Sequence, residues 1–374
     1  MGKRANGEGS IYKRTDGRYC ATLTVEGDKR KSFYGATRQE VSRKLNDALK
    51  SQREGLPVLR ERYTVGQYLS EWLKSTEPSL QPRTFMRYEE IVRLHLAPML
   101  GGTTLARLGP QHLQALYADR LEAGLSSTTV LQVHRVMRRA LDQAARWGLV
   151  ARNVATLVDA PRKRHREIKA LTPDEVRSLL EAASGDRLEA LYAVAVTSGM
   201  RQGELLALRW RFVDLTMGTA QVRGTLQRTR EGLKIAEPKT ARSRRLVRLT
   251  VTATEALRRH KACQAEERLR LGAAWADNDL VFANEVGRPI EATNLVSRSF
   301  APLLKRAGLP RIRFHDLRHT AATLMLAQNV HAKVVSEMLG HSQISITLDL
   351  YSHVTPTMQQ EATAAVDALL TGSS

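Results

Sequence analysis

The polar residues of this 374-residue sequence that best fit chemistry lie in its C-terminal half, in four short clusters. Arg201 and Glu204 stand three residues apart directly after an apolar run, so a helix would place them on one face. A guanidinium at the edge of a buried segment presents paired donors that suit two oxygens of one phosphate. His315 and Arg318 repeat this spacing at a predicted helix N-terminus, where free N–H groups favour an anion.

The other two clusters contribute a lysine, a histidine and a tyrosine. Lys239 lies in a predicted turn between two strands, and Tyr351 follows His341 by ten residues. Taken singly, each residue has an ordinary explanation, because most tyrosines pack against neighbours and most lysines in turns are solvated. The Arg201–Glu204 pair alone is equally compatible with a structural ion pair.

Taken together, these side chains suit metal-free attack on a phosphodiester. Tyr351 is the candidate nucleophile, which would give a covalent phosphotyrosine. The two arginines and a histidine would stabilise the negative transition state. Lys239 would protonate the departing oxygen. The two cysteines, Cys20 and Cys263, lie far apart and give no metal-ligand spacing.

Charge and composition point to a nucleic-acid partner. The sequence has 58 Lys+Arg against 38 Asp+Glu, a net charge of +20, and chains this basic most often bind a polyanion. Its length and 42% hydrophobic content suggest two or three domains. No apolar run of 18 residues and no signal-peptide core occurs, so we expect a cytoplasmic or nucleoid-associated protein without membrane contact.

Residues 1–56 are predicted to form a small basic domain. Residues 1–62 hold 15 Lys+Arg against 8 Asp+Glu, a net charge of +7. Alternating runs at 19–25 and 30–34, with a shorter run at 10–12, predict a three-stranded antiparallel sheet, and 38–53 predicts a helix. Basic residues of the sheet are expected to enter a DNA groove: Arg14, Arg18, Lys29 and Lys31.

Residues 64–160 are predicted to form an all-α domain of four helices. Apolar residues recur at helical spacing in four segments, the last of which begins at Ser127 and stops at Gly148. Basic residues on these helices are candidate contacts to a phosphate backbone, although each alone is compatible with a solvated face: Arg83, Arg87, Arg93, Arg135, Arg138 and Arg139.

Residues 168–374 are predicted to form the third domain, after a basic linker at 161–166. A capping box at Thr172 and Glu175 opens it, and 187–208 is predicted to be helical and apolar, with a helix start at Arg201. Strands are expected within 212–249, and helices from about 252 to the end. The chain is thus expected to be multidomain α+β: a small three-stranded β-sheet plus helix, an all-α four-helix domain, and a mostly α domain with a small antiparallel β-sheet.

The order of these clusters resembles the tyrosine recombinase (phage integrase) family. Its pattern R-x-x-E, Lys on a β-turn, H-x-x-R, LGH and Tyr is present, and three phrases resemble the family: TSGMRQGELLALRW, HDLRHTAATLML and LGHSQISITLDLYSHV. The resemblance covers about 170–370 strongly. Residues 64–150 resemble the family's helical core-binding domain, and 1–55 its arm-binding domain.

The resemblance implies site-specific recombination that integrates or excises a phage or mobile element. Tyr351 would form a 3′-phosphotyrosine with double-stranded DNA, and strand exchange would pass through a Holliday junction, with no metal, ATP or other cofactor. A homotetramer would assemble on core and arm attachment sites. The family pattern suggests that the tail Thr355–Leu370 docks into a neighbouring subunit, although its apolar stripe could also fold back on its own domain. An excision or directionality factor and a host DNA-bending protein are further candidate partners.

Three other classes remain open on the residues alone. A non-enzymatic DNA-binding regulator shares the charge and the helices but does not need seven polar residues in this order. A metal-dependent nuclease would need clustered carboxylates, and the catalytic segments hold few beyond Glu204. A type IB topoisomerase shares the tyrosine chemistry but would nick and rejoin as a monomer.

Overall fold

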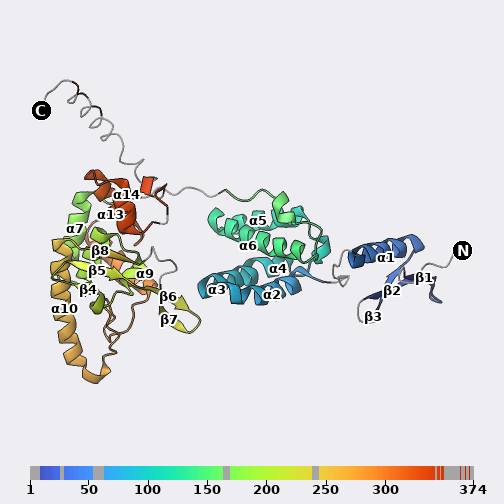
Figure 1. Ribbon diagram of the computed structural model, residues 1–374, viewed down its shortest axis with the longest axis horizontal. Coiled ribbons are helices and arrows are strands. Elements are labelled where there is room, and N and C mark those ends of the chain that lie inside the picture. Colours follow the sequence, from blue (N-terminus) through green and yellow to red (C-terminus); the bar gives the residue numbers. More distant parts are fainter. Residues whose placement is uncertain are drawn as a thin grey trace. The chain divides into compact units, whose positions relative to one another are not determined.

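The computed structural model of the chain divides into two compact units, residues 1–165 and 166–374 (Figure 1). The structure describes residues 9–25, 29–53, 63–162, 169–237 and 244–341, and beyond these only 343–345, 347–348, 363, 367 and 370. Within the described residues, no helix is both long and apolar enough to cross a membrane.

The N-terminal residues form a three-stranded antiparallel sheet with one helix on it. The elements are β1 (Ser10–Lys13), β2 (Tyr19–Val25), β3 (Lys29–Gly35) and α1 (Arg38–Arg53). Ala21, Leu23 and Phe33 of the sheet are buried with Val41 and Leu45 of α1 in one small core. The predicted sheet and helix are confirmed.

Residues 63–162 are all-α. Their helices are α2 (Val65–Thr76), α3 (Pro82–Ile91), α4 (Ala97–Leu100), α5 (Pro110–Glu122) and α6 (Ser127–Arg146), and a π-helical turn, Val92–Leu96, joins α3 to α4. The second predicted helix is therefore one long run with an inserted turn. Trp72 and Tyr68 from α2 pack in one core with Leu116 of α5 and Met137 of α6. The predicted four-helix domain is confirmed.

The second unit is mostly helical, and its other elements surround α8. Its helices are α7 (Pro173–Ala183), α8 (Glu189–Ser198), α9 (Gln202–Leu205), α10 (Val251–Leu271), α11 (Ala292–Asn294), α12 (Ala301–Arg306), α13 (Asp316–Ala327) and α14 (Ala332–Leu339). Helix α8 is buried on nearly every side and packs against α10 and α13, as expected for a helix that is apolar all round.

Two small antiparallel sheets complete this unit. One has the order β4 (Val213–Asp214), β5 (Thr219–Val222) and β8 (Arg245–Arg248), and the other pairs β6 (Thr225–Thr229) with β7 (Gly232–Ala236). Among the described strands, β7 pairs with β6 and β8 pairs with β5, so 237–244 joins two sheets. Lys239, which is expected in a turn between two strands, lies outside the described residues.

Irregular residues separate the helices in two predicted helical regions. In 187–208, α8 ends at Gly199, whose φ of 62° is left-handed, and where a Cβ would strike the side chain of Leu339. From 252 onward, the separating segments include 275–291 and 307–315. The first of these segments is tied to the unit by main-chain bonds, including those from Trp210 N–H to Asp279 O and from Val281 N–H to Leu208 O, both 2.9 Å.

Candidate active site

Arg201 and Glu204 form the local unit that the sequence predicted. Arg201 precedes α9, and its backbone N–H donates to Glu204 Oε2 at 2.9 Å. Its Nη1 donates to Glu204 Oε1, also at 2.9 Å. The carboxylate therefore caps the helix start and orients the guanidinium, whose side chain stays 40% exposed.

A second arginine binds the same carboxylate. Arg245, the first residue of β8, donates from Nη2 to Glu204 Oε2 at 2.8 Å and from Nη1 to Oε1 at 3.2 Å. Burial alone would raise the pKa of Glu204, but the hydrogen bonds and charge of Arg245 and Arg201 outweigh burial and lower that pKa. Glu204 is therefore a buried anion that holds two cations.

Arg318 reaches the same place from α13. It is almost fully buried, and its Nη1 donates to Gly199 O at 2.7 Å. Burial and the neighbouring Arg201 lower the pKa of Arg318 to about 9, so the side chain is still a cation at neutral pH. Its Nη2 is buried and has no hydrogen-bond partner among the described residues. A buried donor left unpaired costs roughly 1–3 kcal/mol, so this nitrogen is a ready contact for an anion.

Two histidines lie beside these arginines. His315 precedes α13, and its ring meets that of His319 edge-on with centroids 4.9 Å apart. Desolvation, then His319 and Arg318, lower the pKa of His315 to about 4. Desolvation, then Arg318 and Arg201, lower the pKa of His341 to about 4. Both rings are therefore neutral at pH 7, and each then carries one N–H.

Two hydrogen bonds hold the segment that follows α14, one from Arg201 and one between His341 and Thr347. Gly340 ends the helix with a φ of 68°, and its carbonyl accepts from Arg201 Nη2 at 2.9 Å. The next residue, His341, pairs its Nδ1 with Thr347 Oγ1 at 2.8 Å. This bond sets which ring nitrogen of His341 faces outward.

Five of the seven predicted catalytic residues are thus brought to one site: Arg201, Glu204, His315, Arg318 and His341. The other two, Lys239 and Tyr351, lie outside the described residues, as does most of the tail Thr355–Leu370. In the sequence, Tyr351 follows Thr347 by four residues. The roles assigned to all seven stay predictions.

Sequence reasoning missed Arg245 and Thr347. The strand pattern around Arg244 and Arg245 gave no reason to prefer one arginine, and only the alternation of β8 shows which one turns inward. Thr347 is fully buried, and its position after the LGH motif carried no signal by itself.

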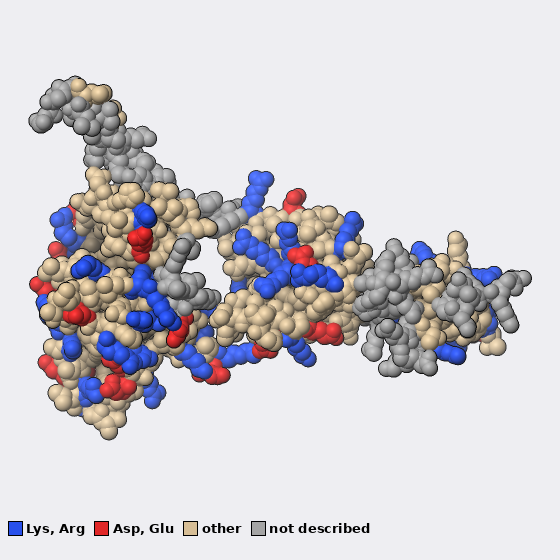
Figure 2. Space-filling model, viewed as in Figure 1, with Lys and Arg blue, Asp and Glu red and all other residues tan. Residues whose placement is uncertain are grey.

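The predicted DNA contacts of the helical domain lie mostly on an exposed face. Arg135, Arg138 and Arg139 project from one side of α6, and Figure 2 shows Lys and Arg side chains grouped on this domain. Arg139 also lies over the ring of Tyr88, 5.6 Å from its centroid. Arg83 is exposed near the start of α3, whereas Arg87 is engaged by Glu90 at 2.7 Å.

The predicted DNA contacts of the N-terminal domain lie in different places. Arg14 and Arg18 are exposed in the turn between β1 and β2. Lys31 shares its sheet face with the buried Phe33, which places it on the α1 side. The side chain of Lys29 lies outside the description. The open face instead carries polar and aromatic side chains: Ser10, Tyr12, Thr22, Thr24, Arg30, Ser32 and Tyr34.

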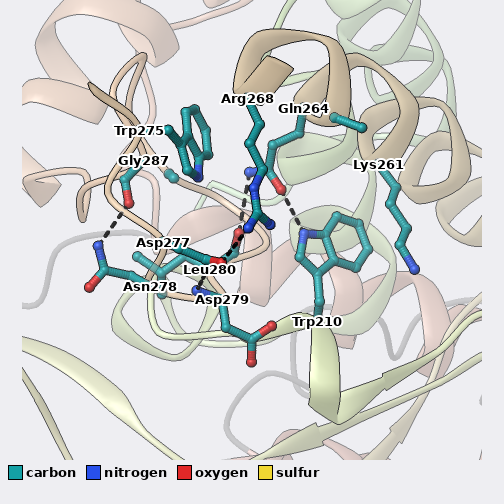
Figure 3. A pocket seen from close by; sticks show the side chains of 12 residues that line it. Trp210, Lys261, Gln264, Arg268, Trp275, Asp277, Asn278, Asp279, Leu280 and Gly287 are labelled. Atoms are coloured by element: carbon teal, nitrogen blue, oxygen red, sulfur yellow. Dashed lines mark hydrogen bonds and ion pairs between the residues drawn. The ribbon is translucent and has the colours of Figure 1, made fainter. Parts of the chain in front are cut away.

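A separate pocket of about 270 Å³ lies between α10 and the 275–287 segment (Figure 3). Several of its polar groups pair with one another. Arg268 pairs with Asp277 at 2.7 Å, and Trp210 Nε1 donates to Gln264 at 2.6 Å. The five assembled candidate catalytic residues do not line it, and we regard it as part of the packing that holds 275–287. Within the described part of the chain, His, Cys, Asp and Glu form no cluster suited to a metal ion.

Comparisons with known proteins agree on one family. The family model for the phage integrase family matches residues 169–358, and the model for the phage integrase N-terminal SAM-like domain matches 64–121. A tyrosine recombinase XerC-like protein from Caldanaerobacter subterraneus subsp. tengcongensis is 32% identical, over 94% of this chain and 95% of the relative.

Solved structures share the fold. The Tn1549 transposon integrase in complex with a circular intermediate DNA superposes with a TM-score of 0.70 at 20% identity, over 81% of this chain and 99% of that chain. A lambda integrase tetramer bound to a Holliday junction gives 0.58 at 18% identity, over 93% and 96%. The match over half of the sequence, together with this full-length relative, shows that the chain belongs to the tyrosine recombinase (phage integrase) family and is a site-specific DNA recombinase.

Proposed function

We propose that this recombinase cleaves DNA by attack of Tyr351 on a phosphate held between Arg201 and Arg318. The observation that carries the proposal is the unpaired, buried Nη2 of Arg318 beside Arg201. Three guanidinium groups, those of Arg201, Arg245 and Arg318, face the single carboxylate of Glu204 and leave a net positive site that fits one phosphodiester.

Each side chain then has one task. Arg201 and Arg318 bind the two non-bridging oxygens, and Glu204 orients Arg201 through the 2.9 Å bond. His315 and His341, neutral near pH 7, donate N–H groups to the same oxygens as negative charge grows on them. Tyr351 loses its hydroxyl proton to water as its oxygen bonds to phosphorus, the bond from phosphorus to the 5′-oxygen breaks, and that oxygen takes a proton from Lys239.

We further propose that four subunits exchange strands on paired sites. The support is the lambda integrase tetramer on a Holliday junction, which shares the fold of this chain. Native mass spectrometry of the complex on two core sites should give four protein chains, and a mass limited to one or two chains would contradict this. An excision or directionality factor and a host DNA-bending protein remain candidate partners, to be sought by purifying the synaptic complex from the host.

The cytoplasm of a bacterial host, on the nucleoid, is the proposed location, because the substrate is chromosomal DNA. A fluorescent fusion to the N-terminus tests this directly. Signal that coincides with stained DNA supports the proposal, and signal spread evenly through the cell or along the membrane contradicts it.

Residues 1–56 are proposed to bind arm DNA through the open face of the β1–β2–β3 sheet. Arg30 is the charged member of that face and is exposed. Arg30→Ala should weaken binding to arm DNA by roughly tenfold while core-site binding stays unchanged, as expected for one lost charged contact. Arg43→Ala removes the same charge from exposed α1 on the other face and is the matched control. Equal losses in the two variants would exclude this face.

The first prediction on the chemistry concerns Tyr351. Tyr351→Phe keeps the ring but removes the attacking oxygen, so covalent adducts on a nicked core substrate should disappear while DNA affinity is retained. Tyr63→Phe, which removes a hydroxyl that donates to Glu71 in the helical domain, is the control and should still form adducts. Adducts formed by the Tyr351 variant would place the nucleophile elsewhere.

A second prediction separates Lys239 from the arginines. A 5′-bridging sulfur leaves readily as a thiolate and does not need a proton. Lys239→Ala should therefore cleave normal DNA slowly but recover on the 5′-thio substrate. Arg201→Ala and Arg318→Ala should not recover, because they act on the non-bridging oxygens. Equal recovery of all three variants would remove the general-acid role from Lys239.

A third prediction follows from the depressed histidine pKa values. A bound phosphate favours the imidazolium form, so it raises the pKa values of His315 and His341 from about 4. The complex then binds more protons than the free protein above pH 4, and core-site affinity should increase as pH falls from 7 towards 5.

The measurement is fluorescence anisotropy with core DNA at constant salt. His341→Gln should show a shallower rise in affinity. His331→Asn is the control, because it replaces an exposed histidine that caps α14 with another capping residue. A slope of affinity against pH that is the same in His341→Gln as in the wild-type protein would contradict the prediction.

A further inference from the structure

Arg245 is the more buried of the two arginines that bind Glu204. Its side chain is 8% exposed, and that of Glu204 is 6% exposed, so the pair is almost wholly removed from water. Arg201, in contrast, binds the same carboxylate with a side chain that is 40% exposed. The two arginines therefore differ in what they can touch, because Arg201 has an open edge for a phosphate and Arg245 is enclosed by protein.

The donors of Arg245 connect two parts of the site. Nη1 and Nη2 bind the two oxygens of Glu204, and Nε donates to Met338 O at 2.9 Å, near the end of α14. Arg201 binds the next part of the same turn, since its Nη2 donates to Gly340 O. Glu204 and the end of α14 are thus held together by both guanidinium groups, and His341 follows directly.

Arg245 and the end of α14 are packed closely against each other. A Cβ on Gly340 would lie 3.2 Å from the guanidinium of Arg245, so the helix end rests on that side chain. Lysine could not replace these contacts, because it has one nitrogen where arginine uses three in a planar fork. The geometry calls for an arginine specifically and not merely for a positive charge.

We propose that Arg245 is a positioning residue for strand cleavage. It holds Glu204 and the end of α14 in register, so that Arg201 and His341 face the same phosphate. It makes no contact with DNA itself. This inference rests on the proposed function, because it takes Arg201 and His341 as groups that act on the phosphate.

The experiment measures three quantities on the full chain: the single-turnover rate of adduct formation, core-site affinity and the urea midpoint. The test variants are Arg245→Ala and Arg245→Lys. The matched control is Arg244→Ala, which removes the neighbouring arginine, 49% exposed and paired with Glu237 at 2.6 Å. A Glu204→Gln variant and the double variant Glu204→Gln with Arg245→Ala complete the set.

Both Arg245 variants should cleave about 10²-fold more slowly, the loss expected when a reacting group is displaced by about 1 Å. Core-site affinity should stay within about threefold of wild type, since Arg245 does not reach DNA, and Arg244→Ala should cleave normally. The double variant should be much less impaired than the product of the two single losses, because both changes disturb one network.

Several results would overturn the proposal. Wild-type cleavage by a folded Arg245→Lys would show that charge alone suffices. Single losses that multiply in the double variant would show that Arg245 and Glu204 act independently. Loss of core-site binding in both Arg245 variants, with protein that is already unfolded without urea, would assign the residue to the fold. These results are distinct from a failure of the proposed function itself. In that case Arg201→Ala would still form adducts.

Discussion

The buried carboxylate of Glu204 is the interaction on which the site depends. It lies between Arg201 and Arg245, and these guanidinium groups also bind the carbonyls of Gly340 and Met338. One charge thus joins the start of α9, the strand β8 and the end of α14. Removing one partner of such a buried pair typically costs about 3–5 kcal/mol, because the remaining charge is left unpaired. The site is therefore built into the stability of the unit.

The other residues of the site carry little negative charge. Arg318 keeps an unpaired buried donor, and positive neighbours contribute to the low pKa values of His315 and His341. These costs fall away when a phosphate enters, since its charge pairs with the arginines and favours the histidine N–H donors. Binding of a phosphodiester therefore removes both costs, and the gain is largest when negative charge builds up in the transition state.

Much of the fold and part of the site could be predicted from the sequence, because those features depend on local patterns. Helical periodicity located α2, α3, α5 and α6, and alternation located the N-terminal sheet. The spacing of Arg201 and Glu204, and of His315 and Arg318, depends only on local helix geometry, so it survived into the structure. That β7 pairs with β6 while β8 pairs with β5 was not predicted, because strand order is a long-range property that turn residues do not reveal.

What sequence could not supply were contacts across long separations. Arg245 meets Met338 over 93 residues, and nothing near Arg245 signals that bond. The break at Gly199 depends on the side chain of Leu339, and the irregular segment 275–291 is held by main-chain bonds to 208–210. Such features follow from packing and not from local propensity.

The most direct test of the account is to find where DNA is attached to the protein. The chain has no lysine or arginine after Lys333, so trypsin releases residues 334–374 as one peptide with Tyr351 as its sole tyrosine. Mass spectrometry of the adduct formed on a nicked core substrate should place a 3′-linked nucleotide on Tyr351 and leave a free 5′-hydroxyl on the other strand end. A nucleotide on any other residue, or a link through a 5′-phosphate, would contradict the account.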